Sequence, residues 1–283
     1  MTRPEFVLAV DLDGTLLAEN DRIHPADLEF LLNNPPVQVI IATGRPWTGI
    51  RRVIELNGIA AADQTSRFPL VINNGAMQLL PGDKLHQHNA FVPEVRRGLA
   101  ELAGDHPEAT FIFQGAYDSW RIGHTHDGDL GVAAYGYQPL DTTPADAERL
   151  PFSKVLCISR DRPLLDAIAR DMAQFPVSGN YSLNDIYEVT PRGVDKAFGI
   201  ERLLPALGLM DYPLVVAGDG ENDESMFAIA DCSFAPLNAT DRIRQMADVV
   251  FDRRPRGLLR PIYEMVMERA MQGRSRAARS AAG

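Results

Sequence analysis

Two aspartates two positions apart follow a short apolar run near the N-terminus of the chain. The run Phe6–Leu12 predicts a buried strand, and Asp11, Asp13 and Gly14 stand at its end. Ligands of open parallel sheets bind outside the carboxyl ends of strands, and residues i and i+2 of an extended chain point the same way. The two carboxylates could therefore serve one catalytic site. A simple Asp-rich turn after a strand is the alternative that this spacing leaves open.

A second polar segment, Thr43-Gly44-Arg45, closes another predicted strand at 37–42 and leads into a predicted helix at 46–57. A hydroxyl, a glycine amide and a helix N-terminus together make a natural seat for an anion. The alternative is that Thr43 only caps the helix.

Two charged segments in the second half of the chain point to the same kind of site. Lys196 lies near the start of a predicted helix, where the helix dipole disfavours a cation unless an anion is close, although a solvated lysine stays open. The run 218–224, Gly-Asp-Gly-Glu-Asn-Asp-Glu, follows the apolar strand 214–217. These acids could be ordinary helix-start residues. Crowded near Asp11 and Asp13, however, they would cost stability, and a bound Mg²⁺ would remove that cost.

The elements that carry these residues alternate between strand and helix at both ends of the chain. This alternation predicts βαβ units and a parallel sheet. The middle of the chain instead predicts an open α+β sheet covered by helices. We therefore expect one core domain formed by residues 1–81 and 189–272, a second domain inserted at 82–188, and a disordered tail at 273–283.

Composition excludes several classes of function. The chain has 28 basic and 38 acidic residues and a net charge of −10, which disfavours general nucleic-acid binding and attachment to anionic membranes. Its two cysteines, Cys157 and Cys232, lie far apart in apolar runs and are expected to be buried thiols. Without an apolar segment long enough to span a membrane, or a signal peptide, the chain is expected to be cytoplasmic.

Taken together, the motifs DLDGT, ATGR, a single lysine and GDGEND resemble those of the haloacid dehalogenase-like (HAD) phosphatases. The long gap between Thr43 and Lys196 resembles the Cof-type hydrolases of subclass IIB, whose larger C2B cap is inserted at this point. The segments 187–196 and 218–226 and Leu237-Asn238-Ala239 look like that subfamily. The resemblance implies an α/β fold, with a Rossmann-like parallel-sheet core and an inserted α+β cap domain.

The resemblance also implies roles for individual residues. Asp11 would be the nucleophile that forms an aspartyl-phosphate, and Asp13 the general acid and base. The implied phosphate-binding residues are Leu12, Thr43, Gly44, Lys196 and Asn222. Asp11, the backbone carbonyl of Asp13, and Asp219 would hold Mg²⁺, with Asp223 supporting them. Arg45 and Asn74 are candidates for contact with the substrate.

The expected function is Mg²⁺-dependent hydrolysis of small phosphorylated metabolites such as a sugar phosphate, pyridoxal phosphate or flavin mononucleotide. A sugar phosphomutase and a non-catalytic phosphate- or Mg²⁺-binding regulator are the alternatives. No nucleic-acid or membrane partner is expected, and the sequence does not set the oligomeric state. The segment 123–129, Gly-His-Thr-His-Asp-Gly-Asp, predicts a loop in the cap, with a second metal site as a weaker interpretation.

Overall fold

The computed structural model describes residues 3–33, 35–135 and 139–281. The chain forms two compact units, one made of residues 1–39, 56–59 and 211–283 and the other of residues 40–55 and 60–210. The predicted domain boundaries at 82 and 188 stay a prediction.

Parallel strands form the centre of the first unit. Their order is β14-β13-β12-β1, with Val7 opposite Leu214 and Val10 opposite Ala217. All residues of β1 and β12 are buried, as expected for strands of a parallel sheet that is covered on both faces. The strands are β1 (Val7–Val10), β12 (Leu214–Ala217), β13 (Cys232–Pro236) and β14 (Val249–Phe251).

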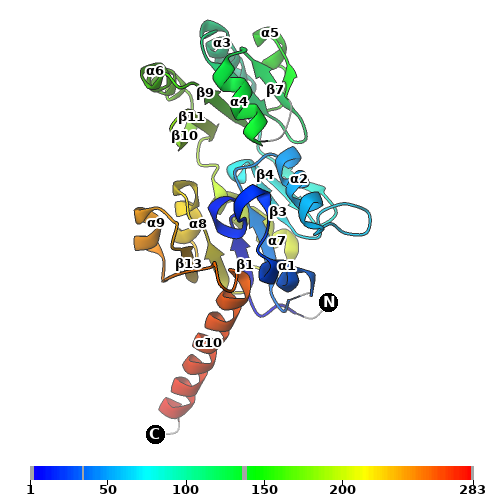
Figure 1. Ribbon diagram of the computed structural model, residues 1–283, viewed down its shortest axis with the longest axis vertical. Coiled ribbons are helices and arrows are strands. Elements are labelled where there is room, and N and C mark those ends of the chain that lie inside the picture. The colour runs from blue at the N-terminus through cyan, green and yellow to red at the C-terminus, as the bar shows by residue number, and fades with distance from the viewer. Residues whose placement is uncertain (1–2, 34, 136–138, 282–283) are drawn as a thin grey trace. The chain divides into compact units, whose positions relative to one another are not determined.

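Helices follow these strands in the first unit. Helix α8 packs on β12, α9 packs on β13, and α1 contacts α10 (Figure 1). The wide turn η1 (Leu12–Leu16) follows β1 directly, and the single turn η4 (Glu221–Asp223) comes just before α8. The remaining elements are η2 (Glu19–Asp21), α1 (Pro25–Leu32), α8 (Glu224–Ala228), α9 (Asp241–Met246) and α10 (Leu259–Ala281).

The second unit contains two sheets. In the first, strands β2 and β3 are parallel, and β4 and β5 continue the order β2-β3-β4-β5 in antiparallel pairs. Helix α7 packs on β3 and β4. The elements, most of whose residues lie in this unit, are β2 (Gln38–Ala42), α2 (Trp47–Asn57), β3 (Leu70–Ile72), the turn η3 (Asn73–Gly75), β4 (Met77–Leu80), β5 (Lys84–His88) and α7 (Lys196–Leu207).

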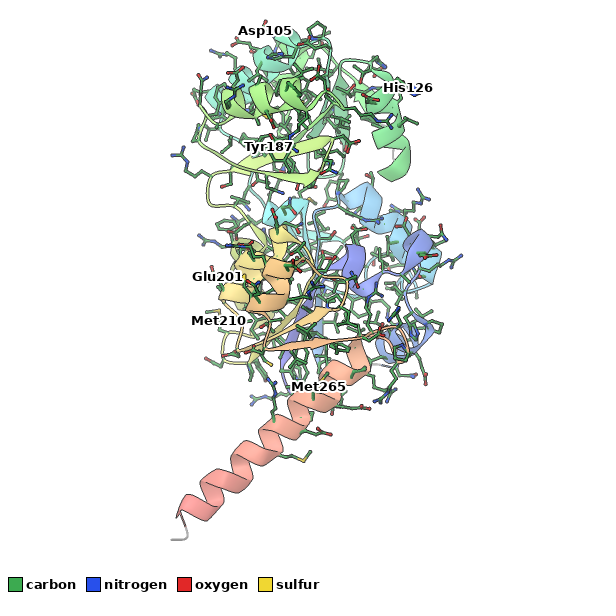
Figure 2. The ribbon with its side chains drawn as sticks, turned by 60° about the vertical axis from the view of Figure 1, so that its left-hand side comes forward. Asp105, His126, Tyr187, Glu201, Met210 and Met265 are labelled. Atoms are coloured by element: carbon green, nitrogen blue, oxygen red, sulfur yellow. The ribbon has the colours of Figure 1, made fainter. Side chains whose placement is uncertain are left out.

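The other sheet of this unit has six strands in the order β10-β11-β9-β6-β7-β8, antiparallel except for the pair β7–β8. Its apolar core lies between the sheet and helices α3 and α6. Asp105, His126 and Tyr187 mark α3, α4 and β11 in Figure 2. The elements are α3 (Pro93–Asp105), β6 (Thr110–Gln114), β7 (Ser119–Ile122), α4 (His126–Tyr135), β8 (Leu140–Asp141), α5 (Pro144–Ala147), β9 (Lys154–Ile158), α6 (Arg162–Met172), β10 (Val177–Leu183) and β11 (Ile186–Pro191).

Three segments differ from what the sequence predicts. Helix α4 begins at His126, inside the segment expected to be a loop, because only Gly123 of its two glycines adopts a left-handed backbone. Strand β10 was not expected, since Ser178, Gly179 and Asn180 interrupt its apolar pattern. Helix α10 continues to Ala281 through the tail expected to be disordered, and its alanine and arginine residues are good helix formers. The last two residues of that tail lie outside the described part.

The two cysteines differ in their surroundings. Cys157 is buried, as expected, and burial raises its thiol pKa well above the ordinary range. Cys232 is only half-buried, so the prediction of a buried thiol is wrong for this residue. Among the residues that the structure describes, no helix is both long and apolar enough to cross a membrane.

Candidate active site

The carboxylates predicted from the sequence gather at the ends of β1 and β12 in the first unit. The amide of Asp11 donates to the carbonyl of Ala217 at 2.9 Å, which continues the pairing of the two strands by one residue. The chain therefore leaves the sheet at Asp11 on one strand and at Gly218 on the next. This places Asp11 and Asp219 on adjacent strand ends, the position at which parallel sheets bind ligands.

Three of these carboxylates form a compact cluster. Asp11, Asp219 and Asp223 each have a carboxylate oxygen, and the three oxygens lie within 4.8 Å of one another. Asp11 is only 5% exposed and Asp223 is fully buried. Negative charges held this close in a buried place repel one another, and a divalent cation with oxygen ligands removes the repulsion. The donor set therefore fits a divalent metal ion.

Asp223 also organises the loop that carries Asp219. Its Oδ2 accepts hydrogen bonds from the amides of Asp219 at 2.8 Å and Gly220 at 2.9 Å. The hydroxyl of Thr15 donates to Oδ1 of Asp219 at 2.8 Å. Asp219 is thus held from both its backbone and its side chain. The sequence motif contained Thr15, but sequence reasoning gave it no role.

The turn η1 carries Asp13 away from the strand. Asp13 is exposed and extended (φ −73°, ψ 123°), and Gly14 then takes a left-handed conformation at φ 76°. A Cβ atom on Gly14 would collide with the carboxylate of Asp219. Glycine is therefore required here for two reasons, the backbone conformation and the close approach of Asp219. The side chain of the predicted phosphate ligand Leu12 is fully buried, which anchors the turn.

Asn222 lies in the turn η4, beside the cluster in sequence. It is partly buried, and its side-chain oxygen packs against Gly220. Asp11, Asp219 and Asp223 thus form one cluster within the first unit, and Leu12 and Asn222 are their neighbours along the chain.

Thr43, Gly44 and Arg45 form a fixed loop in the second unit. Thr43 is fully buried, and its amide donates to the carbonyl of Val71 at 2.8 Å. Its hydroxyl oxygen accepts the amide of Arg45 at 3.1 Å. Helix α2 begins only at Trp47, so Thr43 does not cap it and that alternative is excluded. With its oxygen occupied by an N–H donor, the Thr43 hydroxyl can donate its own hydrogen to an anion.

Lys196 is the first residue of α7, and its side chain is fully buried. The helix is capped by Asp195, whose carboxylate accepts the amide of Phe198 at 2.9 Å. The turn η3 packs closely on this helix start, where a Cβ atom on Gly75 would collide with the carbonyl of Asp195. Burial excludes the interpretation of Lys196 as a solvated surface lysine. A buried cation at a helix N-terminus favours a nearby anion.

Of the two candidate substrate residues, Arg45 is half-exposed and Asn74 is buried. The Asn74 amide group donates to Oε1 of Glu188 at 2.6 Å. Glu188 in turn pairs with Lys154 at 2.6 Å. Sequence reasoning assigned no role to either charge, although Lys154 opens a strand that is otherwise apolar. The structure brings Asp11, Asp219 and Asp223 together in the first unit, and it joins Thr43 to Arg45 and Asn74 in the second. Their convergence with one another and with Lys196 and Asp13 stays a prediction.

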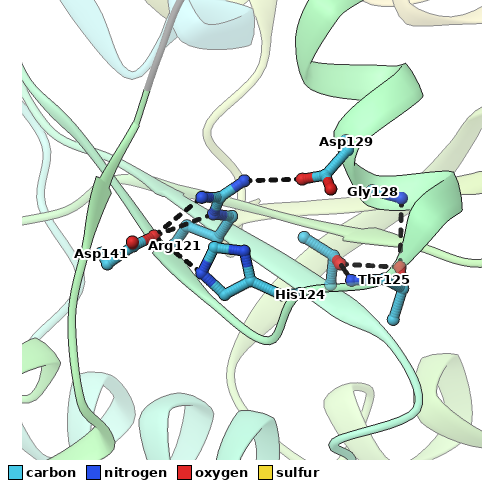
Figure 3. Close-up of polar contacts among 7 residues, drawn as sticks. Arg121, His124, Thr125, Gly128, Asp129 and Asp141 are labelled. Carbon is cyan, nitrogen blue, oxygen red and sulfur yellow. Dashed lines mark hydrogen bonds and ion pairs between the residues drawn. The ribbon is translucent and has the colours of Figure 1, made fainter.

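The histidine segment forms polar contacts of its own in the second unit (Figure 3). Nε2 of His124 lies 3.0 Å from Oδ1 of Asp141, which also pairs with Arg121 at 2.9 Å. Arg121 reaches Asp129 at 2.8 Å on its other side. The hydrogen bond from Arg121 lowers the pKa of Asp141. These contacts join β7, β8 and α4 on an exposed surface, and among the residues that the structure describes this segment contributes to no cluster of potential metal ligands like that at Asp11.

Comparison with known proteins decides the family. The sequence profile of the haloacid dehalogenase-like hydrolases matches residues 8–256. The chain belongs to this family. The match includes both groups of candidate site residues.

Relatives and solved structures agree with this assignment. The chain is 29% identical over 250 residues to a phosphoglycolate phosphatase of Natronomonas pharaonis, covering 87% of this chain and 90% of that protein. It is 23% identical over 258 residues to the 5-amino-6-(5-phospho-D-ribitylamino)uracil phosphatase YitU of Bacillus subtilis, covering 87% and 92%. A HAD subclass IIB sugar phosphatase has a similar fold, with a TM-score of 0.77 at 19% identity, covering 92% and 98%. A protein of Thermotoga maritima has a similar fold with a TM-score of 0.75 at 22% identity, covering 89% of this chain and 94% of that chain.

These comparisons confirm three predictions for this HAD hydrolase. The family is the one that the motifs resemble, the fold is mixed α/β with a parallel-sheet core, and the enzyme class is phosphatase.

Proposed function

We propose that this HAD hydrolase is a Mg²⁺-dependent phosphatase that hydrolyses small phosphorylated metabolites through an aspartyl-phosphate on Asp11. The observation that carries the proposal is the cluster of Asp11, Asp219 and Asp223, whose carboxylate oxygens lie within 4.8 Å of one another at the ends of β1 and β12. Such a cluster costs stability and needs a function to explain it.

In the first step, a carboxylate oxygen of Asp11 attacks the phosphorus of the substrate. The bond between phosphorus and the leaving alcohol oxygen breaks, and Asp13 donates its proton to that oxygen. Burial of Asp11 fixes its position, while the exposure of Asp13 leaves its side chain accessible to a leaving group.

In the second step, water attacks the phosphorus of the aspartyl-phosphate. Asp13, now ionised, takes the proton of that water, and the bond between phosphorus and Asp11 breaks to release inorganic phosphate. A residue that can act as a base at position 13 makes the intermediate short-lived and favours hydrolysis over storage of the phosphoryl group.

The loop of Thr43 and Gly44, together with Lys196, holds the phosphoryl oxygens in this proposal. The Thr43 hydroxyl oxygen accepts the Arg45 amide, and its hydrogen would be donated to a phosphoryl oxygen. Lys196 supplies a positive charge that offsets the repulsion between the Asp11 carboxylate and a phosphate. The amide of Leu12 and the side chain of Asn222 complete the predicted cradle.

Asp11, the Asp13 carbonyl and Asp219 would hold Mg²⁺, with Asp223 fixing Asp219. Bound there, the ion would neutralise the cluster and lower the repulsion between Asp11 and phosphate. Among divalent ions, Mg²⁺ suits a site with few carboxylates that shares its ligands with a phosphate.

Residues 82–188 would act as the cap that excludes water and selects the leaving group. Support comes from the similarity in fold to a subclass IIB sugar phosphatase. One relative is named as a phosphatase of phosphoglycolate and another as a phosphatase of a phosphoribitylamino-uracil. These two names support a substrate class no narrower than small phosphorylated metabolites.

The test is release of inorganic phosphate from p-nitrophenyl phosphate and from a panel of phosphorylated metabolites, with Mg²⁺ and with EDTA. The proposal expects release that needs the metal and is lost in Asp11→Asn. Isomerised sugar phosphate without release would instead show a phosphomutase.

A further inference from the structure

Lys154 and Glu188 form a buried ion pair that the proposed chemistry does not use. Nζ of Lys154 lies 2.6 Å from Oε2 of Glu188, and each side chain is only 4% exposed. In the sheet, Glu188 on β11 stands opposite Leu156 on β9, so Lys154 is its diagonal neighbour on the same face. Removing two charges from water is costly, and such a pair is weak support for stability. Stability alone therefore does not explain why this ion pair is buried, and its contacts with neighbouring residues must be considered.

The ion pair reaches the proposed phosphate loop directly. Nζ of Lys154 donates a second hydrogen bond, of 2.9 Å, to the carbonyl oxygen of Gly44. That carbonyl belongs to the same planar peptide group as the amide of Arg45, and the two point in opposite directions. The Arg45 amide donates to the hydroxyl of Thr43 at 3.1 Å. This one peptide group is thus held by Lys154 on one side and bonded to the Thr43 side chain on the other.

Asn74 closes the network into a ring. The backbone N–H of Asn74 donates to the carbonyl of Thr43 at 3.1 Å, and the side-chain NH2 group of Asn74 donates to Glu188 at 2.6 Å. Asn74 has a left-handed backbone (φ 51°), a conformation that asparagine tolerates better than most residues. The ring passes from the loop through Lys154, Glu188 and Asn74 back to the loop. All four members lie in the second unit.

We propose that Lys154 is a positioning residue, which with Glu188 and Asn74 sets the Gly44–Arg45 peptide and through it the direction of the Thr43 hydroxyl. Glu188 holds the ammonium of Lys154 and the amide of Asn74 at fixed places. The role rests on the proposed function, since it matters for catalysis only if the loop binds phosphate. Asn74 then acts on the loop and not on the substrate.

The test compares Lys154→Met with Leu156→Ala. Leu156 lies two residues along β9 on the same face of the sheet, and its buried side chain belongs to an apolar cluster with Ile112 and Ile158. Both variants should lower the melting temperature. Only Lys154→Met should weaken binding of inorganic phosphate, measured by calorimetry, by about tenfold or more, because small misplacements of binding groups have large effects. It should also speed hydrogen exchange at the Arg45 amide.

A second variant covers the case in which Lys154→Met does not fold. Glu188→Gln keeps the shape but replaces one of the two acceptor oxygens with an amide nitrogen that only donates, and it removes the charge that holds Lys154. It should shift phosphate binding and Arg45 exchange in the same direction by less. The double variant Lys154→Met/Glu188→Leu should recover stability without recovering phosphate affinity.

The outcomes separate the two proposals. A wild-type protein that neither binds phosphate nor releases it from any ester overturns the proposed function. In that case hydrogen exchange at the Arg45 amide still tests whether Lys154, Glu188 and Asn74 hold the loop in place. A folded Lys154→Met variant with phosphate affinity within about twofold of wild type and unchanged Arg45 exchange overturns the positioning role.

Discussion

The amide of Asp219 donates a hydrogen bond to Oδ2 of Asp223 at 2.8 Å. The same oxygen accepts the amide of Gly220 at 2.9 Å, so a single carboxylate oxygen holds two consecutive peptide groups. A Cβ atom on Gly218 would collide with the carboxyl group of Asp223, which shows how tightly the loop wraps around it. Asp223 therefore determines where the proposed metal ligand Asp219 lies.

Replacing Asp223 should affect metal affinity more than chemistry. In Asp223→Ala the amides of Asp219 and Gly220 lose their acceptor, and the Mg²⁺ concentration for half-maximal activity should rise by about 10- to 100-fold. Asp223→Asn keeps one oxygen acceptor and should show a smaller rise. Glu221→Ala, an exposed acid in the same turn, is the matched control and should leave metal dependence unchanged. An unchanged Mg²⁺ titration in Asp223→Ala would contradict this role.

Gly14 and Gly193 allow a matched comparison of close approach and backbone strain. Both have a left-handed backbone, at φ 76° and φ 74°, but only Gly14 faces a neighbour, the carboxylate of Asp219. Alanine should cost about 1–2 kcal/mol of stability at either position from the backbone alone. Gly14→Ala should in addition displace Asp219 and abolish most Mg²⁺-dependent activity, whereas Gly193→Ala should stay active. Equal activity of the two variants, corrected for folded fraction, would show that the close approach of Asp219 to residue 14 does not require a glycine there.

Asp11→Asn should change activity and stability in opposite directions. Loss of the nucleophile should lower kcat by about 10⁴-fold or more. Without metal, removal of one of three mutually repelling carboxylates should raise the melting temperature. Added Mg²⁺ should stabilise the wild type more than the variant, because the variant binds the ion less well. A variant that is less stable than wild type in EDTA would show that the cluster is not under repulsion.

The parts of the fold that the sequence predicts well are those with continuous apolar runs. Strands β1 and β12 are buried on all sides, so their composition alone identifies them, and the motifs at their ends locate the acidic cluster. Strand β10 escaped prediction because it lies at the edge of its sheet, where it pairs with β11 alone among the described strands, and tolerates polar residues in its middle.

The positioning network could not be predicted for a different reason. Lys154 and Glu188 are 34 positions apart, and whether they meet depends on the register between β9 and β11, which tertiary packing sets. The position of Asp223 illustrates the same limit. Its acidic neighbours predict a cation site, but only the folded loop shows that Asp223 binds backbone amides.

The buried carboxyl group of Asp27 should make the stability of the folded protein depend on pH. The fully buried carboxylate in α1 accepts the amides of Leu258 and Leu259 at the start of α10, at 2.7 to 2.9 Å. Burial raises the pKa of Asp27 above its usual range of about 3.8, and the two amides oppose this shift only in part. The folded state therefore binds this proton more readily than the unfolded state. The contribution of Asp27 is greatest below the unfolded pKa and is lost as the pH rises through the folded pKa.

Urea unfolding of wild type, Asp27→Asn and Asp252→Asn between roughly pH 2 and 7, which spans the titration of both carboxyl groups, measures this contribution. The stability of wild type relative to Asp27→Asn should fall as the pH rises. Asp252 is the control of opposite sign, because its hydrogen bonds with Arg254 lower its pKa to about 2. Stability relative to Asp252→Asn should be present above the unfolded pKa and be lost as the pH falls toward 2, with a small amplitude because the pair is exposed. If both comparisons slope the same way, the buried environment of Asp27 does not control its titration, and the amides of Leu258 and Leu259 dominate instead.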